Sequence, residues 1–264
     1  MGSSEVQGKL WGRAAKDWAE LFEPMSKPIW IAMLDSAGVK KGTRFLDLGC
    51  GGGGSSVLAN ERGAQVSGLD AAEALITIAY ERVPDGDFRV GDLEELPYED
   101  YSFDVAFASM SIMFVTNPSI ALREMGRVIV SGGQVTVGIW GKPEECEYRH
   151  ILKAVADTLP SPPSGKGPFA LSGDGILEGM MESAELNIID SGKVNAPFRF
   201  KDFEVMWKIV SSAGPLQSTR QVVGERKLKK AIIQAAEPFQ SDNGEILFNN
   251  RFRYVTATVE GKSV

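Results

Sequence analysis

The chain has 264 residues, of which 43% are hydrophobic and 24% charged, values typical of a folded soluble protein with one α/β domain and a modest insertion. A formal net charge of −7 argues against a nucleic-acid partner. The two cysteines, Cys50 and Cys146, are too few and too far apart for a disulfide framework or a metal site, so we expect no metal and a reducing compartment. No apolar run approaches the roughly 20 residues that cross a bilayer, and residues 1–9 lack a secretory signal, so we expect a cytoplasmic protein without a membrane partner.

Helices and strands alternate along the first half of the chain. Apolar residues at helical spacing predict two helices ahead of the first strand, over residues 10–22 and 28–37. Short apolar runs then predict strands at 43–48, 65–69, 88–90, 104–108 and 134–140. The start and turn signals between them are Ser55 and Ser56, the capping-box pair Asp70 and Glu73, Asn117 before Pro118, and Gly132 with Gly133.

The second half is less regular and predicts a helical cap between the last strands. Helices are expected at 145–159, 176–184, 203–210 and 222–236, with a loop at 160–165. Strand patterns at 187–194 and 251–259 supply a sixth and a seventh strand. Strands that alternate with helices predict an α/β fold, doubly wound around a mainly parallel sheet.

A glycine-rich segment directly follows the first predicted strand. Gly49, Gly51 and Gly53 let the backbone turn sharply and approach a ligand closely. Asp47 stands two positions ahead of the first glycine, and its carboxylate can pair with a cationic ligand or order the loop amides. Gly49, Gly51 and Gly54 also satisfy the G-x-G-x-x-G pattern of nicotinamide and flavin folds, which leaves a dinucleotide site as an alternative.

Two further aspartates close the second and third strands. Asp70 lies where a carboxylate accepts the ribose hydroxyls of an adenosine, a role that both kinds of site share. Asp92 can accept the exocyclic amine of adenine while the N–H of Leu93 meets a ring nitrogen. Together with Asp47 they form a row of carboxylates that repels a pyrophosphate and accepts a sulfonium cation with an ammonium group. The row therefore favours S-adenosylmethionine.

The combined motifs resemble the UbiE-like branch of class I, Rossmann-like S-adenosylmethionine-dependent methyltransferases, over residues 11–141. They are Phe45-Leu46-Asp47-Leu48-Gly49-Cys50-Gly51-Gly52-Gly53, then Gly68-Leu69-Asp70, Val90-Gly91-Asp92-Leu93-Glu94-Glu95-Leu96-Pro97 and Ser102-Phe103-Asp104-Val105. The resemblance implies a seven-stranded sheet with the last strand antiparallel and the methyl donor above the glycine loop. It implies a single domain over 1–264, with helices and donor-binding core at 10–141, cap elements at 142–186 and 198–250, and last strands at 187–197 and 251–260.

The resemblance also assigns donor contacts. Asp47, Gly49 and Gly51 would hold the methionine part, Asp70 the ribose, and Asp92 with Leu93 the adenine. Trp11 and Trp18 belong to an opening segment that folds over the donor in relatives, although an amphipathic helix on the sheet edge explains them equally well. The full predicted set for the donor S-adenosyl-L-methionine, and its product S-adenosyl-L-homocysteine, is Asp47, Gly49, Cys50, Gly51, Gly53, Asp70, Ala71, Asp92, Leu93, Ser109, Trp11 and Trp18.

The acceptor side is expected to be apolar. Many relatives carry histidines where Met113 and Phe114 stand, so the resemblance supplies no base there. His150, the only histidine, is a candidate base, with a surface helix residue as the alternative. The residues predicted for a hydrophobic acceptor pocket, with packing in the core as the alternative, are Met110, Met113, Phe114, Trp140, Phe169 and Trp207.

The sequence thus predicts an S-adenosylmethionine-dependent methyltransferase that transfers a methyl group by direct in-line displacement to a small, largely apolar molecule. Two alternatives stay open: a nicotinamide-dependent oxidoreductase, and a protein that binds the donor without methyl transfer. The acceptor, the acceptor atom and the oligomeric state carry no signature in the sequence.

Overall fold

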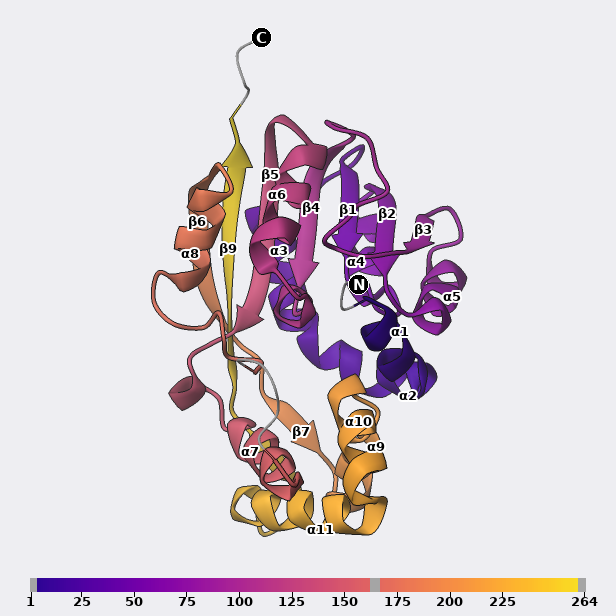
Figure 1. Ribbon diagram of the computed structural model, residues 1–264, viewed down its shortest axis with the longest axis vertical. Helices are drawn as coiled ribbons and strands as arrows, with labels where there is room; N and C mark the ends of the chain where they lie inside the picture. The colour runs from indigo at the N-terminus through magenta and orange to yellow at the C-terminus, as the bar shows by residue number, and fades with distance from the viewer. Residues whose placement is uncertain (1–3, 162–166, 261–264) are drawn as a thin grey trace.

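A computed structural model describes residues 4–161 and 167–260 (Figure 1). Residues 162–165 of the predicted 160–165 loop lie outside this range. A seven-stranded sheet in the order β3-β2-β1-β4-β5-β9-β6 forms the centre. Its strands are β1 (Arg44–Leu48), β2 (Gln65–Asp70), β3 (Asp87–Val90), β4 (Phe103–Ser109), β5 (Ile129–Trp140), β6 (Leu186–Asn195) and β9 (Arg251–Val259).

β9 runs antiparallel to both of its neighbours, whereas β1 to β5 pair in parallel. The predicted fold class, including the antiparallel last strand, is therefore confirmed. The sequence predicted a turn at Gly132 and Gly133 before the fifth strand, but both glycines lie inside that strand. Gly132 adopts a φ of +78° within β5, where the register with β4 shifts, so β5 begins at Ile129 rather than 134.

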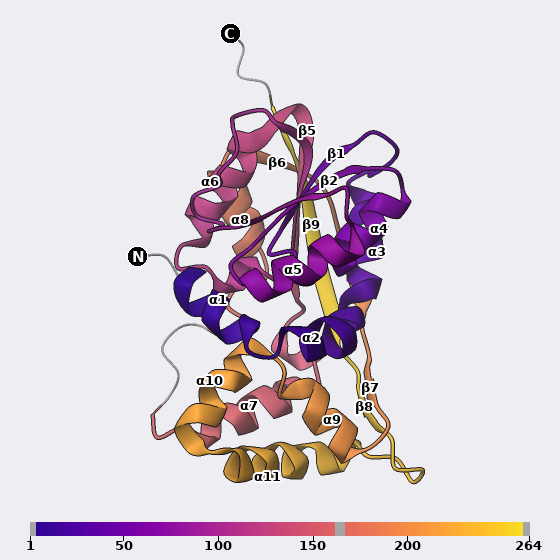
Figure 2. The ribbon, with the colours of Figure 1, turned by 90° about the vertical axis from the view of Figure 1, so that its right-hand side faces the viewer.

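Helices cover both faces of the sheet (Figure 2). Phe45 belongs to the hydrophobic core that includes residues of α3 (Lys27–Ser36), α4 (Gly54–Glu61) and α5 (Glu73–Arg82). The next residue, Leu46, belongs to a second core, with residues of α6 (Pro118–Val128) and α8 (Ile176–Ser183). Successive strand residues point to opposite faces, so each strand contributes to two cores. Asn117 caps α6 as predicted, since its side chain accepts the N–H of Ser119.

A helical cap stands beyond the ends of the strands, at the foot of the view in Figure 1. It consists of α7 (Arg149–Thr158), α9 (Phe203–Val210), α10 (Gly214–Val223) and α11 (Glu225–Ala236), with α11 packed on α7. A two-stranded sheet of β7 (Phe198–Phe200) and β8 (Ile246–Phe248), which the sequence analysis missed, connects it to the core. Short 3₁₀ turns lie at Ile112–Phe114, Pro143–Glu145 and Glu237–Phe239.

The N-terminal segment lies between the sheet and the cap. The single helix predicted over residues 10–22 is wrong: α1 (Ser4–Gly12), α2 (Ala15–Asp17), a π-helical turn (Trp18–Phe22) and a 3₁₀ turn (Glu23–Ser26) follow one another instead. α1 packs against both α10 and α5, so the break lets one short segment contact two parts of the molecule. Among the described residues, no helix has the length and apolar character needed to span a bilayer.

Candidate functional site

A cavity of about 260 Å³ lies beyond the carboxyl ends of the parallel strands. It opens where β1 neighbours β4, the point at which strand order reverses and where open α/β sheets bind their ligands. The loop after β1 and residues that follow β2, β3 and β4 form its floor, and α1, the π-helical turn and α10 cover it. Its volume suits a small molecule.

The loop after β1 is held in one conformation by the protein itself. Gly49 has a φ of +72°, and a Cβ there would stand 2.3 Å from the Cβ of Ser111. Each N–H of residues 49–53 is donated to a protein oxygen: two to Leu69 O, and one each to Asp70, Glu23 and Cys50 O. A bound phosphate needs free backbone N–H groups at such a loop, and here they are already engaged.

Asp70 reaches the cavity from the end of β2. Its Oδ2 accepts the N–H of Gly51 at 2.9 Å, and its Oδ1 accepts the N–H of Ala72 at 2.9 Å. The predicted capping box with Glu73 is therefore wrong, because Ala72 is the N-cap of α5 and the carboxylate joins two loops instead. Burial raises the pKa of Asp70 above its usual range, and the backbone N–H groups oppose that rise.

Asp47 does not line the cavity, which favours the second of its two predicted roles, the ordering of the loop amides, over direct contact with the ligand. It is 1% exposed, and its Oδ2 accepts the hydroxyl protons of Ser55 and Ser56 at 2.7 Å each. These serines were expected to cap the helix, but Gly53 is the N-cap of α4 and the hydroxyls turn inward. Burial raises the pKa of Asp47 to about 6. The side chain orders the loop from behind.

Asp92 and Leu93 line the cavity beyond β3, as predicted. The Oδ1 of Asp92 accepts the N–H of Glu94 at 2.9 Å, which fixes the turn that presents both residues. The remaining predicted donor residues also line the cavity, except Gly53, which lies behind it against Ala79. Those that line it are Gly49, Cys50, Gly51, Ala71, Ser109, Trp11 and Trp18.

Glu23 is a cavity residue that the sequence analysis missed. Its Oε1 accepts the N–H of Gly52 and its Oε2 accepts Nη1 of Arg82, both at 2.7 Å, and the residue is 5% exposed. Burial raises its pKa to about 7 against the lowering effect of Arg82. Glu23 therefore ties the N-terminal segment to the glycine loop and to α5. No local sequence signal marks this contact, because Glu23 and Gly52 are 29 positions apart in the chain.

Aromatic side chains form a continuous wall of the cavity, which we call the aromatic wall: Phe114, Trp11, Trp18, Phe22 and Tyr148. Each ring meets the next at a steep angle, with centroid separations of 5.5, 4.6, 4.9 and 6.1 Å in that order. Such edge-to-face contacts suit the charge distribution of aromatic rings. The wall extends from the N-terminal segment to the start of α7 and makes one side of the cavity apolar throughout.

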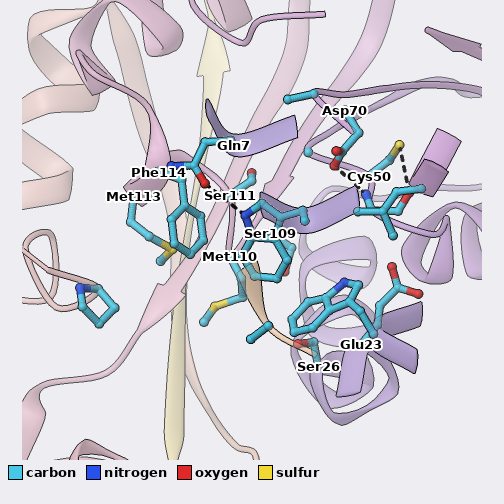
Figure 3. A pocket seen from close by; sticks show the side chains of 18 of the residues that line it. Gln7, Glu23, Ser26, Cys50, Asp70, Ser109, Met110, Ser111, Met113 and Phe114 are labelled. Carbon is cyan, nitrogen blue, oxygen red and sulfur yellow. Dashed lines mark hydrogen bonds between the residues drawn. The ribbon is translucent and has the colours of Figure 1, made fainter. Parts of the chain in front are cut away.

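Four of the six predicted acceptor residues line the cavity: Met110, Met113, Phe114 and Trp140. Figure 3 shows the two methionines and Phe114 on the side away from Asp70 and Glu23. Met110 has a φ of +56°, a conformation that residues with a side chain adopt rarely and that often marks a functional site. This backbone directs the chain away from β4 immediately at the cavity.

Three predicted residues lie elsewhere. Phe169 packs on Trp140, with ring centroids 5.6 Å apart, but stands behind it, and Trp207 is buried in the cap. His150 is exposed on α7, with its ring centroid 5.4 Å from that of Phe239, and does not line the cavity, which agrees with the alternative of a surface helix residue. A helix turns successive side chains by about 100°, which places Tyr148 at the cavity and His150 away from it.

Known proteins match the core of this chain. Residues 46–137 match the family model described as methyltransferase domain. A demethylmenaquinone methyltransferase of Renibacterium salmoninarum is 34% identical over 50% of this chain and 59% of its own length. A malonyl-acyl-carrier-protein O-methyltransferase of Erwinia pyrifoliae is 33% identical over 50% of either chain. The matches thus span between half and three fifths of these curated relatives.

Solved structures extend the likeness in fold beyond that core. The cyclase SpnF superposes with a TM-score of 0.58 over 88% of this chain and 80% of its own, at 20% identity. This likeness shows a shared Rossmann-like fold. Residues 46–137 match the methyltransferase domain model, and the relatives that match this part of the chain are methyltransferases, in agreement with the UbiE-like resemblance.

Proposed function

We propose that the protein is an S-adenosyl-L-methionine-dependent methyltransferase that acts on a small, largely apolar molecule by direct in-line displacement. The observation that carries this proposal is that every backbone N–H from Gly49 to Gly53 already donates a hydrogen bond to a protein oxygen. Two of these oxygens belong to carboxylates. Such a loop disfavours the pyrophosphate of a dinucleotide and suits a cationic ligand. The methyltransferase relatives support the same assignment.

The residues at the cavity floor fit this donor. Asp70 keeps lone pairs for the ribose hydroxyls, and Asp92 with the N–H of Leu93 would hold the adenine. The hydroxyl of Ser109 is buried without a hydrogen-bond partner among the described residues and would meet the methionine part. Asp47 acts on the donor only through the loop that it orders.

When bound, the donor supplies an activated methyl group on a sulfonium centre. The remaining work of the protein is to place the acceptor in line with that group and to keep water out. The aromatic wall and the cap exclude water, and Met110, Met113 and Trp140 give the acceptor an apolar surface. Orientation of this kind contributes several kcal/mol, up to roughly 7 to 11 in the best aligned cases.

Calorimetry with S-adenosylmethionine, S-adenosylhomocysteine and NAD tests the donor assignment on the full chain. We expect the first two ligands to bind and Asp70→Asn to weaken them by roughly 10- to 100-fold, because a charged hydrogen-bond acceptor is lost. Asp87→Asn, at the far end of β3 and paired with Arg89, is the matched control and should change little. Tighter binding of NAD would reject the proposal.

Transfer itself is tested with labelled donor and a metabolite extract. We expect label to appear in a small apolar product. If the protein bound the donor but transferred no label under any condition, it would be a donor-binding protein without methyl transfer. The proposal that it is an enzyme would then be rejected.

A further inference from the structure

Two glycines of the loop after β1 receive another segment of the chain rather than a ligand. Gly52 and Gly54 do not line the cavity and have no positive φ, so neither a ligand nor the turn requires a glycine there. A Cβ on Gly52 would stand 2.6 Å from the Cβ of Ala19, and a Cβ on Gly54 would stand 2.5 Å from the ring of Trp30. Both contacts are with the N-terminal segment, so the absence of side chains in the loop lets that segment approach.

The N-terminal segment carries a buried carbonyl that its own backbone does not satisfy. In the π-helical turn Trp18–Phe22, the N–H of Glu23 donates to the carbonyl of Trp18. The next position along the chain is Pro24, which has no N–H to offer the carbonyl of Ala19. Ala19 is buried, so its carbonyl needs a hydrogen-bond donor from another part of the protein.

Arg82, the last residue of α5, supplies that hydrogen bond. Its Nη2 donates to the carbonyl of Ala19 at 2.8 Å, and its Nη1 donates to the carbonyl of Gly52 at 2.9 Å and to Oε2 of Glu23 at 2.7 Å. A planar guanidinium meets several oxygens at once in a fixed geometry, which a lysine does not. Arg82 thus fastens the π-helical turn to the glycine loop, although it does not line the cavity itself.

The turn that Arg82 fastens carries part of the cavity surface. Trp18 and Phe22 both line the cavity, and they are two of the five rings of the aromatic wall. π-Helical turns are rare and occur frequently at functional sites. Because the contacts of this turn set the position of both rings relative to the glycine loop, a ligand on the loop would meet a wall that Arg82 holds in place.

We propose that Arg82 is a positioning residue for the methyl donor: by holding the π-helical turn on Gly52, it keeps Trp18 and Phe22 in place over the bound ligand. This inference rests on the proposed function and adds to its site a residue that touches neither donor nor acceptor. A protein whose binding conformation is populated only part of the time binds its ligand more weakly, in proportion to the lost fraction. Loss of Arg82 therefore lowers donor affinity even where the fold survives.

Calorimetry with S-adenosylhomocysteine on the full chain tests this role, with thermal unfolding as the check that each variant is folded. We expect Arg82→Ala to weaken binding by roughly 5- to 30-fold, and Arg82→Lys to weaken it less, because lysine keeps the charge but meets fewer oxygens. Arg62→Ala is the matched control and should leave affinity unchanged. The side chain of Arg62 is 26% exposed, against 27% for Arg82, and pairs with Asp35 away from the cavity.

Gly52→Ala tests the seat of the turn without touching Arg82. The added Cβ displaces Ala19 while the backbone of residue 52 stays unstrained, so donor affinity should fall here as well. Gly179→Ala, in α8, is the control, because a Cβ there has no neighbouring atom within 4 Å among the described residues.

A double-mutant cycle separates positioning from a general loss of stability. If Arg82 acts through the aromatic wall, Arg82→Ala should weaken S-adenosylhomocysteine much less in a Trp18→Ala background than in the parent protein. Unchanged affinity in Arg82→Ala or Gly52→Ala, an equal loss in Arg62→Ala, or additive losses in the cycle would overturn the proposal. Should Arg82→Ala fail to fold, Arg82→Lys decides by the same criteria. A folded parent protein that does not bind S-adenosylhomocysteine would instead reject the proposed methyltransferase.

Discussion

At the scale of single residues, the three aspartates at the strand ends have different roles that their spacing does not reveal. Asp70 is the last residue of β2 and Asp92 lies two residues past β3, and these places at strand ends made it predictable that both line the cavity. Asp47 lies within β1, where side chains alternate between faces, so it shares the face of Phe45 and meets the first turn of α4. The spacing of Asp47 from the glycines in the sequence suggested a ligand contact. The alternation of side chains along β1 instead directs the carboxylate toward α4.

Asp47 predicts an unusual pH dependence of stability. Its pKa rises from an ordinary 3.8 to about 6 on folding, so the unfolded chain loses this proton first and the contribution of Asp47 to the free energy of unfolding falls as pH rises between those values. Asp47→Asn removes this loss. Relative to the parent protein, the variant should gain up to about 3 kcal/mol between pH 4 and pH 7, measured by urea denaturation.

Asp242→Asn is the control for this measurement, because Asp242 is exposed in the loop that precedes β8. Its stability relative to the parent should be the same at both pH values. If Asp47→Asn behaved in the same way, its buried carboxyl would not be the group that titrates on unfolding.

At the scale of elements, the N-terminal segment and the glycine loop form one unit through Glu23. The side chain accepts the N–H of Gly52 and pairs with Arg82, so three separate elements converge on one carboxyl. The sequence predicted strands, turns and most helices because glycines, prolines and apolar periodicity are local signals. It could not predict the break after Gly12 or the three-residue strands β7 and β8, since tertiary contacts set the first and too few residues mark the second.

Glu23→Ala should destabilise the fold by about 1–3 kcal/mol, because the N–H of Gly52 is left buried without its partner. Donor affinity should fall as well, since the loop loses one of its anchors. Urea denaturation and calorimetry with S-adenosylhomocysteine measure the two effects. Glu20→Ala, in the same segment but with a 54% exposed side chain, is the control, and equal losses in both variants would argue against a special role for Glu23.

At the scale of the whole molecule, the structure of the core can be predicted from the sequence more fully than that of the cap. The core repeats one pattern of strand, turn and helix, and its ligand edge follows from the order of the strands. The cap depends on contacts between distant segments, such as α7 with α11 and α1 with α10. The sequence therefore did not predict that Tyr148 lines the cavity, although it marked the nearby His150 as a candidate. His150 was chosen for its residue type, but it is exposed, whereas Tyr148 is buried.

The aromatic wall also gives the protein a built-in optical reporter. The protein has five tryptophans. Four line the cavity, Trp11 and Trp18 in the aromatic wall and Trp30 and Trp140 outside it, and the fifth, Trp207, is buried in the cap. Tryptophan emission depends on local polarity, so filling the cavity should change the intrinsic fluorescence in a saturable way, and Trp207→Phe should preserve most of that signal. A ligand whose binding is established by calorimetry but leaves the spectrum unchanged would have to sit elsewhere. Unlabelled compound collections can thus be screened directly by light.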